Sequence, residues 1–183
     1  EIGAHALENT VLTRADFGSK LELIGNSAFR QSRLTVVTMP ANSNLMIIQD
    51  DAFFYNPLTS ITFGDKLETI GQRAFYNTDL TRFMIPNTVT SIGQYALYQN
   101  TRMQEIRVPS NITLQSIFGG VPNSLNKVTV FSSGSTSLVE YFAQNTRVAQ
   151  VVLEKEITSI EQSAFNNAQS LQKINLENIT AIR

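Results

Sequence analysis

The sequence predicts an α/β-type solenoid, a right-handed superhelix of about eight coils, and three observations support this fold class. Similar segments restart at steps of 22, 24, 22, 22, 22, 23 and 23 residues along the chain. Each segment carries the same spaced apolar string, and a second apolar pair precedes most restarts. A constant period near 22 residues is typical of solenoids, in which each unit packs on its neighbours. The segments begin at Ile2, Ile24, Ile48, Ile70, Ile92, Leu114, Ser137 and Ile160.

The clearest repeat, residues 70–91, predicts one short strand per coil. Its apolar string is Leu80, Phe83 and Ile85, an L-x-x-L-x-L pattern. Residues two apart on a strand share a face, so Phe83 and Ile85 should point inward, and Arg82 and Met84 outward. This is the strand pattern of a leucine-rich repeat. The equivalent positions are apolar in all eight segments, which predicts a row of parallel strands on a concave face.

The rest of each repeat predicts a second wall and a turn. Pairs such as Val89 and Ile92, flanked by residues that favour strands, predict a short extended segment on the opposite wall. An Ala-Phe pair then follows, as in Ala74-Phe75, where the small alanine lets two backbones approach and the ring fills the coil. We expect this stretch to be a helical turn or irregular. The other such pairs are Ala28-Phe29, Ala52-Phe53 and Ala164-Phe165, with Ala6-Leu7 and Ala96-Leu97 as variants.

The repeat pattern weakens over residues 114–159. Ser137 and Glu140 have the spacing of a capping box, and Leu138, Tyr141 and Phe142 would share one helical face. These features predict a helix over about 138–146. Two interpretations remain open: drifted repeats that still pack, or a local bulge that acts as a recognition patch or a hinge.

Composition excludes several classes of protein. Hydrophobic residues make up 42% of the chain and charged residues 16%, which indicates a globular protein rather than a disordered one. A net charge of −1 argues against a dedicated nucleic-acid binder. There are no cysteines and no apolar run long enough to span a membrane. We expect residues 1–183 to form a single domain, a fragment of a longer array that opens and closes inside a repeat.

Candidate catalytic or metal-binding residues are scarce, and we expect neither an enzyme nor a cofactor. His5 is the only histidine, and a surface or capping role is favoured over a catalytic one. Asp50-Asp51 lies in what we interpret as a widened turn after Ile48, without the spacing of a calcium loop. Asn111 and Asn178 begin Asn-x-Thr sequons, which would be glycosylation sites only in a eukaryotic protein.

The outward side chains of the strand row are the predicted partner-binding surface. Five positive and two negative residues give this row a charge of +3, whereas the whole chain carries −1. An acidic or mixed partner would therefore be favoured, such as an acidic glycan or protein loop, although a solvated sheet face is the simpler alternative. The residues proposed to contact a partner are Arg14, Asp16, Arg82, Met84, Glu105, Arg107, Lys127, Gln150, Lys173 and Asn175.

The recurring motifs Ile-Gly-x-x-Ala-Phe, Leu-x-x-Ile-x-Ile-Pro and Val-Thr-Ser-Ile resemble the BspA-like class of leucine-rich repeats. Residues 2–113 and 160–182 resemble it closely and 114–159 weakly. The class often has a cysteine shortly after the Ala-Phe pair. Here that stretch holds polar residues that could form a ladder satisfying backbone groups. They are Asn9-Thr10, Ser32, Asn56, Asn77-Thr78, Asn100-Thr101 and Asn167.

This resemblance implies a noncatalytic, secreted or surface-attached protein of a host-associated microbe. Its expected role is adhesion, through protein or glycan ligands such as host matrix proteins, with no nucleic-acid partner and no membrane insertion of this segment. Two alternatives remain: a structural spacer without a ligand of its own, and an accessory module of a larger secreted enzyme. Charge reversal at Arg82, Arg107 and Lys127 would separate the binding module from these alternatives.

Overall fold

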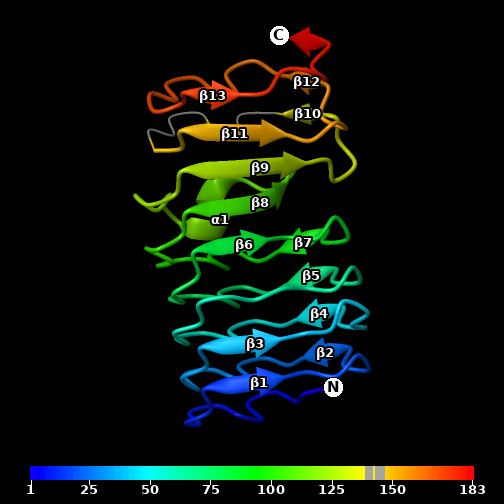
Figure 1. Ribbon diagram of the computed structural model, residues 1–183, viewed down its shortest axis with the longest axis vertical. Coiled ribbons are helices and arrows are strands. Elements are labelled where there is room, and N and C mark those ends of the chain that lie inside the picture. The colour runs from blue at the N-terminus through cyan, green and yellow to red at the C-terminus, as the bar shows by residue number, and fades with distance from the viewer. Residues whose placement is uncertain (139–141, 143–146) are drawn as a thin grey trace.

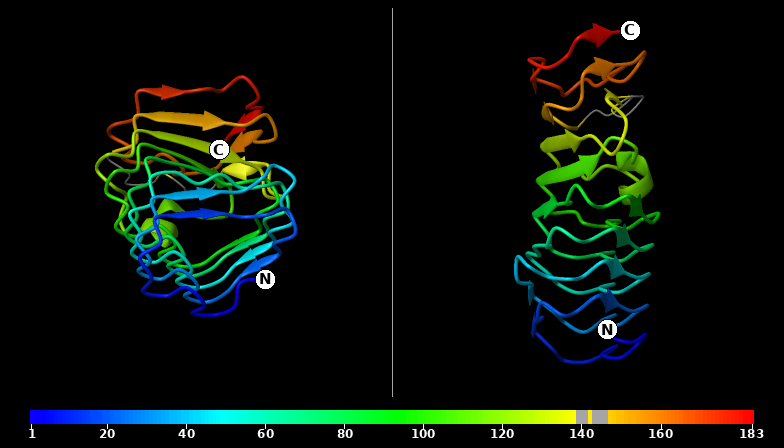
Figure 2. Two further views of the ribbon diagram at one scale, coloured as in Figure 1. Left: turned by 60° about the horizontal axis from the view of Figure 1, so that its bottom comes forward. Right: turned by 90° about the vertical axis from the view of Figure 1, so that its right-hand side faces the viewer.

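The computed structural model describes residues 1–138, 142 and 147–183 and shows an elongated stack of similar coils (Figures 1 and 2). Strands of successive coils pair in parallel, and the paired residues lie 22–24 positions apart, as in Arg14↔Val36 and Leu23↔Ile47. This register confirms the predicted solenoid. Each regular coil has three walls, which we call the front wall, the rear wall and the turn wall.

The front wall contains the strands predicted from the L-x-x-L-x-L string. Five of these strands form one parallel sheet in the order β13-β11-β9-β8-β6, and β1 and β3 form a separate pair. Inward and outward residues alternate as expected, since Phe83 is buried between the exposed Arg82 and Met84. The front strands are β1 (Arg14–Asp16), β3 (Val36–Thr38), β6 (Arg82–Met84), β8 (Glu105–Pro109), β9 (Lys127–Phe131), β11 (Gln150–Leu153) and β13 (Lys173–Ile174).

The rear wall contains two-residue strands at the predicted second apolar pairs. They form two sheets, β2-β4-β5-β7 and β10-β12-β14. In Figure 1 their arrows point opposite to those of the front wall, because the chain returns across the coil. The rear strands are β2 (Leu23–Ile24), β4 (Ile47–Ile48), β5 (Thr69–Ile70), β7 (Ser91–Ile92), β10 (Ser137–Leu138), β12 (Ser159–Ile160) and β14 (Ala181–Ile182).

The turn wall follows each rear strand and carries a third ladder of hydrogen bonds between coils. The amides of Phe29, Phe53 and Phe75 each donate to an alanine carbonyl of the next coil, at 2.8, 2.8 and 2.9 Å. Two non-glycine residues per regular coil adopt positive φ here, which turns alternate amides toward the neighbouring coil. In the coil that begins at Ile48 these are Asp51 and Tyr55, both with φ 55°. The stretch expected to be helical or irregular is therefore an ordered, hydrogen-bonded turn.

The glycines that follow the first residue of a repeat at Gly25, Gly71 and Gly93 allow close approach of backbones and do not adopt positive φ. A Cβ atom on Gly71 would lie 2.5 Å from the backbone of Gln49 and Asp50, and one on Gly93 would lie 2.2 Å from the amide nitrogen of Gln72. Such contacts are shorter than van der Waals packing allows.

The core is a column of side chains that runs through the stack. Phe29, Phe53 and Phe75 stack on one another with ring centroids 5.3 and 5.2 Å apart, and all three are fully buried. The apolar string positions are buried in the central coils. In the outermost coils of the stack, Leu12 and Leu176 are 37% and 45% exposed, so those two positions differ from the prediction.

Four of the polar residues after the Ala-Phe pair, Ser32, Asn56, Thr78 and Asn100, are buried inside the turn as expected, whereas Asn9, Thr101 and Asn167 are exposed. Asn56 is fully buried, accepts a hydrogen bond from the Leu34 amide at 2.9 Å and donates to the Phe29 carbonyl at 2.6 Å. Asn100 is buried too and donates to the carbonyls of Phe75 and Leu97, both at 2.8 Å. The Leu34 amide and the Phe75 carbonyl depend on these side chains, whereas the Phe29 and Leu97 carbonyls also accept from the backbone amides of Ser32 and Asn100.

The weak repeats contain one helix that the sequence analysis missed. Helix α1 (Leu114–Phe118) lies in the turn wall, where the Ser116 and Ile117 carbonyls accept from the Tyr95 and Leu97 amides at 2.8 and 2.9 Å. Thr113 is its N-cap and Gly119, at φ 65°, its C-cap. The expected helix over 138–146 is wrong at its first residue, because Leu138 pairs with Ile160 in β10–β12. Phe142 lies in a bend, and the other positions of that helix lie outside the described residues.

The step of 24 residues between Ile24 and Ile48 contains two more residues than most others, and these do not lie in the turn after Ile48, where the widened turn was expected. The turn after Ile48 is regular, because Asp51 takes the same positive φ as Ser27 and Arg73. The step from Leu23 to Ile47 is longer because the loop from Pro40 to Asn44, between β3 and β4, is longer than its counterparts. This loop packs against the next coil, where a Cβ on Gly64 would lie 3.1 Å from the Ser43 side chain.

Candidate functional site

The front wall brings half of the predicted contact residues into one line. Strand register pairs Arg82 with Glu105, Glu105 with Lys127, and Lys127 with Gln150. Met84 lies two residues from Arg82 on the same outward face, 43% exposed. Parallel pairing at a constant register therefore converts residues far apart in sequence into a continuous surface.

A groove of about 830 Å³ lies along this surface. Arg82, Glu105 and Lys127 are its charged residues, and most of the others carry hydroxyl or amide groups. Such a lining can donate and accept hydrogen bonds along the groove. The lining residues are Thr59, Ser60, Ile61, Thr62, Thr81, Arg82, Met84, Gln104, Glu105, Ser124, Asn126, Lys127 and Gln150.

The charges in the groove pair with one another. The Glu105 carboxylate lies 3.2 Å from Arg82 Nε and 2.7 Å from Lys127 Nζ, so one anion bridges two cations on adjacent strands. Arg82 is the most exposed of the three, with 73% of its side chain accessible against 18% for Glu105. Two positive groups and one negative group leave a net charge of +1 in the groove. The charge available to a partner is therefore smaller than the +3 counted along the row.

The groove lies where the front sheet is interrupted. Between the coil of Ser60 and the coil of β6, no backbone hydrogen bond joins the described front-wall residues, although Thr59 still donates to Thr35 at 3.1 Å. The rear wall and the turn wall stay paired at this junction, through Ile47↔Thr69 and through the Phe53 amide. Alternation along β6 directs the backbone groups of Arg82 and Met84 toward this gap. The groove can therefore offer main-chain as well as side-chain hydrogen bonds.

Bulky rings meet at the interruption. Phe63 packs edge-on against Phe83 with centroids 5.4 Å apart, and against Phe75 at 6.0 Å. Edge-to-face rings need more room than the roughly 4.8 Å between paired strands. This packing gives a physical reason for the two front segments to separate.

Arg14 and Asp16, at the N-terminal end of the row, bind each other. Arg14 Nε and Nη2 donate to the two Asp16 oxygens at 2.8 and 2.7 Å, and Thr38 also donates to Asp16. The hydrogen bonds from Arg14 and then Thr38 lower the pKa of the Asp16 carboxyl below its ordinary value, and Asp16 raises the pKa of Arg14. These two residues lie outside the groove.

Arg107 binds other residues of the protein and is not available to a partner on the surface. Its side chain is only 16% exposed and donates to Glu154 through Nε at 2.6 Å and Nη2 at 2.8 Å. It also donates to the Ile85 carbonyl at 2.6 Å and to Asn87, and it lies 4.1 Å over the ring of Phe131. Arg107 thus ties together four successive coils, including the weak repeats.

Replacing Arg107 by lysine should destabilise the fold by about 1–3 kcal/mol, because an ammonium group cannot keep the bidentate contact with Glu154. Urea unfolding measures the change, and hydrogen exchange should show it first in residues 127–131 and 150–154. Arg102→Lys is the matched control, since the Arg102 side chain is 63% exposed and makes one 3.7 Å ion pair. Equal stability of the two variants would show that the Arg107 contacts do not brace the stack.

The last two predicted contact residues lie at the C-terminal end of the row. Asn175 accepts from the Leu153 amide at 2.7 Å and donates to the Leu153 carbonyl at 2.8 Å, so its amide continues the sheet past β13. Lys173 is exposed and registers beside Gln150, outside the groove.

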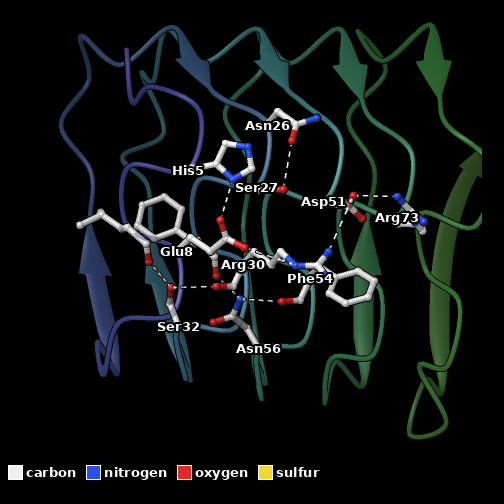
Figure 3. Close-up of polar contacts among 12 residues, drawn as sticks. His5, Glu8, Asn26, Ser27, Arg30, Ser32, Asp51, Phe54, Asn56 and Arg73 are labelled. Atoms are coloured by element: carbon white, nitrogen blue, oxygen red, sulfur yellow. Dashed lines mark hydrogen bonds and ion pairs between the residues drawn. The ribbon is translucent and has the colours of Figure 1, made fainter.

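Charged side chains on the turn wall form a separate strip (Figure 3). His5 Nδ1 lies 2.6 Å from Glu8, and Arg30 lies 3.5 Å from Glu8 and 3.9 Å from Asp51. Asp51 in turn binds Arg73 at 2.8 Å. His5 is therefore a surface histidine with a carboxylate neighbour. Among the described residues there is no group of three or more His, Cys, Asp or Glu side chains that could hold a metal ion, and no helix is long and apolar enough to cross a membrane.

Comparison with models of known protein families shows which family the chain belongs to. The family model for the BspA type leucine rich repeat region matches residues 1–118 and 68–183, which together cover the whole chain. The chain belongs to this family. The weak repeats of this BspA-type protein are thus part of the array rather than an insertion from another fold. No curated protein matches the sequence.

Solved structures of bacterial leucine-rich repeat proteins share the fold. A leucine-rich repeat protein from T. pallidum is 22% identical with a TM-score of 0.64, and the match covers 80% of this chain and 70% of that one. Proteins from Bacteroides ovatus and Eubacterium ventriosum are 18% and 19% identical, with TM-scores of 0.58 and 0.53. The matches cover 93% and 98% of this BspA-type chain but only 56% and 63% of theirs.

Proposed function

We propose that this BspA-type array is a noncatalytic binding module, exposed on a cell surface or secreted, that recognises a protein or glycan through the front-wall groove. The observation that carries the proposal is the aligned set Arg82, Glu105, Lys127 and Gln150 along a groove of about 830 Å³. A repeat scaffold with a polar groove suits binding, because the surface is extended and its side chains are held by paired strands.

The chemistry of the groove favours an extended, polar ligand of mixed charge. Its net charge of +1 attracts an acidic group only modestly, whereas its many hydroxyl and amide groups can pair with peptide or sugar hydrogen-bonding groups. The interrupted sheet adds main-chain groups of Arg82 and Met84. We therefore expect adhesion to protein or glycan partners, host matrix proteins among them, with affinity that depends only weakly on salt.

The double variant Arg82→Gln, Lys127→Gln should reduce binding roughly tenfold or more while the fold stays intact, because both cations border the groove. Binding is measured on a glycan array and on immobilised fibronectin, fibrinogen and laminin. Arg107 is left unchanged, since its removal would test stability rather than recognition.

The matched control is Lys20→Gln, Lys155→Gln, which removes the same charge from exposed positions outside the groove. Equal binding by the two double variants would place recognition on another surface. Binding to none of the probes would favour the spacer role instead.

A further inference from the structure

A column of stacked side chains runs along the turn wall, separate from the front-wall groove. Arg30, Phe54, Tyr76 and Tyr98 occupy the same position in four successive coils. The Phe54 and Tyr76 rings lie 4.6 Å apart at 22°, and the Tyr76 and Tyr98 rings 5.2 Å apart at 29°. Each ring is partly exposed. The column is thus an aromatic surface with two ends.

One end of the column is capped by a cation. The Arg30 guanidinium carbon lies 4.1 Å from the centroid of the Phe54 ring, and Figure 3 shows this side chain beside that ring. A guanidinium over an aromatic face is attracted by the negative potential of the ring. Within the protein, a cationic group therefore already stacks on one end of this column.

At the other end the next coil supplies no side chain. Tyr98 meets Gly119, and a Cβ atom added there would lie 2.7 Å from Tyr98 Cδ2 and 2.9 Å from Tyr95 Cε1. Gly119 takes φ 65° as the C-cap of α1, so helix formation in this coil places a glycine at the end of the column. A pocket of about 380 Å³ results, lined by Tyr76, Tyr95, Tyr98 and Gly119.

Tyr95 forms a side of this pocket. Its ring stands at 74° to that of Tyr98, with centroids 5.6 Å apart, so two ring planes meet at nearly a right angle. Tyr95 also has φ 60°, an unfavourable conformation for a bulky residue, which is held by the bond from its amide to the Ser116 carbonyl at 2.8 Å. Perpendicular rings around a small space form half of an aromatic cage.

We propose that the pocket of Tyr76, Tyr95, Tyr98 and Gly119 binds an organic cation, an ammonium or guanidinium group. Three features carry this assignment: the end of the aromatic column, where Gly119 contributes no side chain, the perpendicular Tyr95 ring, and the Arg30 cation at the opposite end. None of the described residues lining the pocket is charged, although burial raises the pKa of the Tyr76 hydroxyl group and Arg73 lies close enough to lower it. Such a group occurs on lysine and arginine side chains of a protein and on a choline head group. The site is independent of the front-wall groove.

The test is a titration of the folded chain with choline chloride and with N-acetyl-arginine amide, followed by NMR of the tyrosine rings. The chain has five tyrosines and no tryptophan. We expect saturable shifts at the Tyr95 and Tyr98 rings. The neutral isostere 3,3-dimethyl-1-butanol should bind at least about fivefold more weakly, because it lacks the charge. Tighter binding of choline would indicate a choline head group as the natural ligand, and tighter binding of N-acetyl-arginine amide would indicate a protein side chain.

Variants of Tyr98 distinguish the contribution of its aromatic ring to binding from that of its hydroxyl group. Tyr98→Leu should abolish the shifts, Tyr98→Phe should keep them, and Phe165→Leu, whose ring stacks on Phe142 and does not line this pocket, should not change them. If Tyr98→Leu does not fold, Tyr95→Leu replaces it, because that variant leaves the stacked column intact and should also abolish the shifts. Equal binding of the neutral isostere, shifts that survive both leucine variants, or binding of N-acetylglucosamine without binding of either cation would each overturn the proposal.

Discussion

Replacing Phe75 by alanine should lower the free energy of unfolding by about 3–5 kcal/mol, the largest effect expected for one substitution in this chain. The Phe75 ring is fully buried and packs against Phe53 at 5.2 Å, Phe83 at 5.0 Å and Phe63 at 6.0 Å. Its removal would leave a cavity between the coils that begin at Ile48 and Ile70, which those coils cannot close because hydrogen bonds fix their spacing. Urea unfolding followed by circular dichroism measures the change.

Tyr55→Ala is the control for this experiment. Tyr55 also contacts other rings, but it is 44% exposed, so its truncation creates no enclosed cavity. We expect a loss of less than about 1 kcal/mol from it. If Phe75→Ala unfolded at the same urea concentration as the parent chain, the ring could not lie in the centre of the stack.

Replacing Asn56 by alanine should lower the free energy of unfolding by about 1–3 kcal/mol for a different reason, the loss of a buried hydrogen-bond partner. The Asn56 side chain is the partner of the Leu34 amide at 2.9 Å and of the Phe29 carbonyl at 2.6 Å. Without it, the Leu34 amide would be buried and unpaired, which costs about 1–3 kcal/mol, whereas the Phe29 carbonyl would still accept from the Ser32 amide at 3.2 Å. Thermal and urea unfolding measure the loss.

Asn42→Ala is the matched control, because Asn42 is exposed in the loop between β3 and β4. That variant should unfold like the parent chain. Asn56→Asp should be intermediate, since it keeps the acceptor for Leu34 and loses the donor to Phe29. Full stability of Asn56→Ala would show that the polar ladder is incidental to folding.

Periodicity predicted the features that recur in every coil. The inward positions of Phe83 and Ile85, the Ala-Phe column and the polar residues after it depend only on local spacing, which parallel stacking repeats. The outward row, including Arg82, Glu105, Lys127 and Gln150, was predicted for the same reason. The structure adds the groove along it.

Features that depend on contacts between coils were not predictable from one repeat. Arg107 was counted as a surface charge, but its partner Glu154 lies 47 residues away, two coils further along the stack. The interruption of the front sheet depends on rings from two different coils, Phe63 and Phe83. Helix α1 had a local signal that was overlooked, namely Thr113 as a possible N-cap and Gly119 after the last helical residue.

Backbone hydrogen exchange resolved by NMR tests the stacked-coil account most directly. Amides that join the turn walls of successive coils, those of Leu7, Phe29, Phe53, Phe75 and Leu97, should exchange slowly. Across the interruption of the front sheet, the amides of Arg82 and Met84 should exchange fast and that of Phe83 slowly. Fast exchange throughout the turn wall, or slow exchange at Arg82 and Met84, would contradict the account.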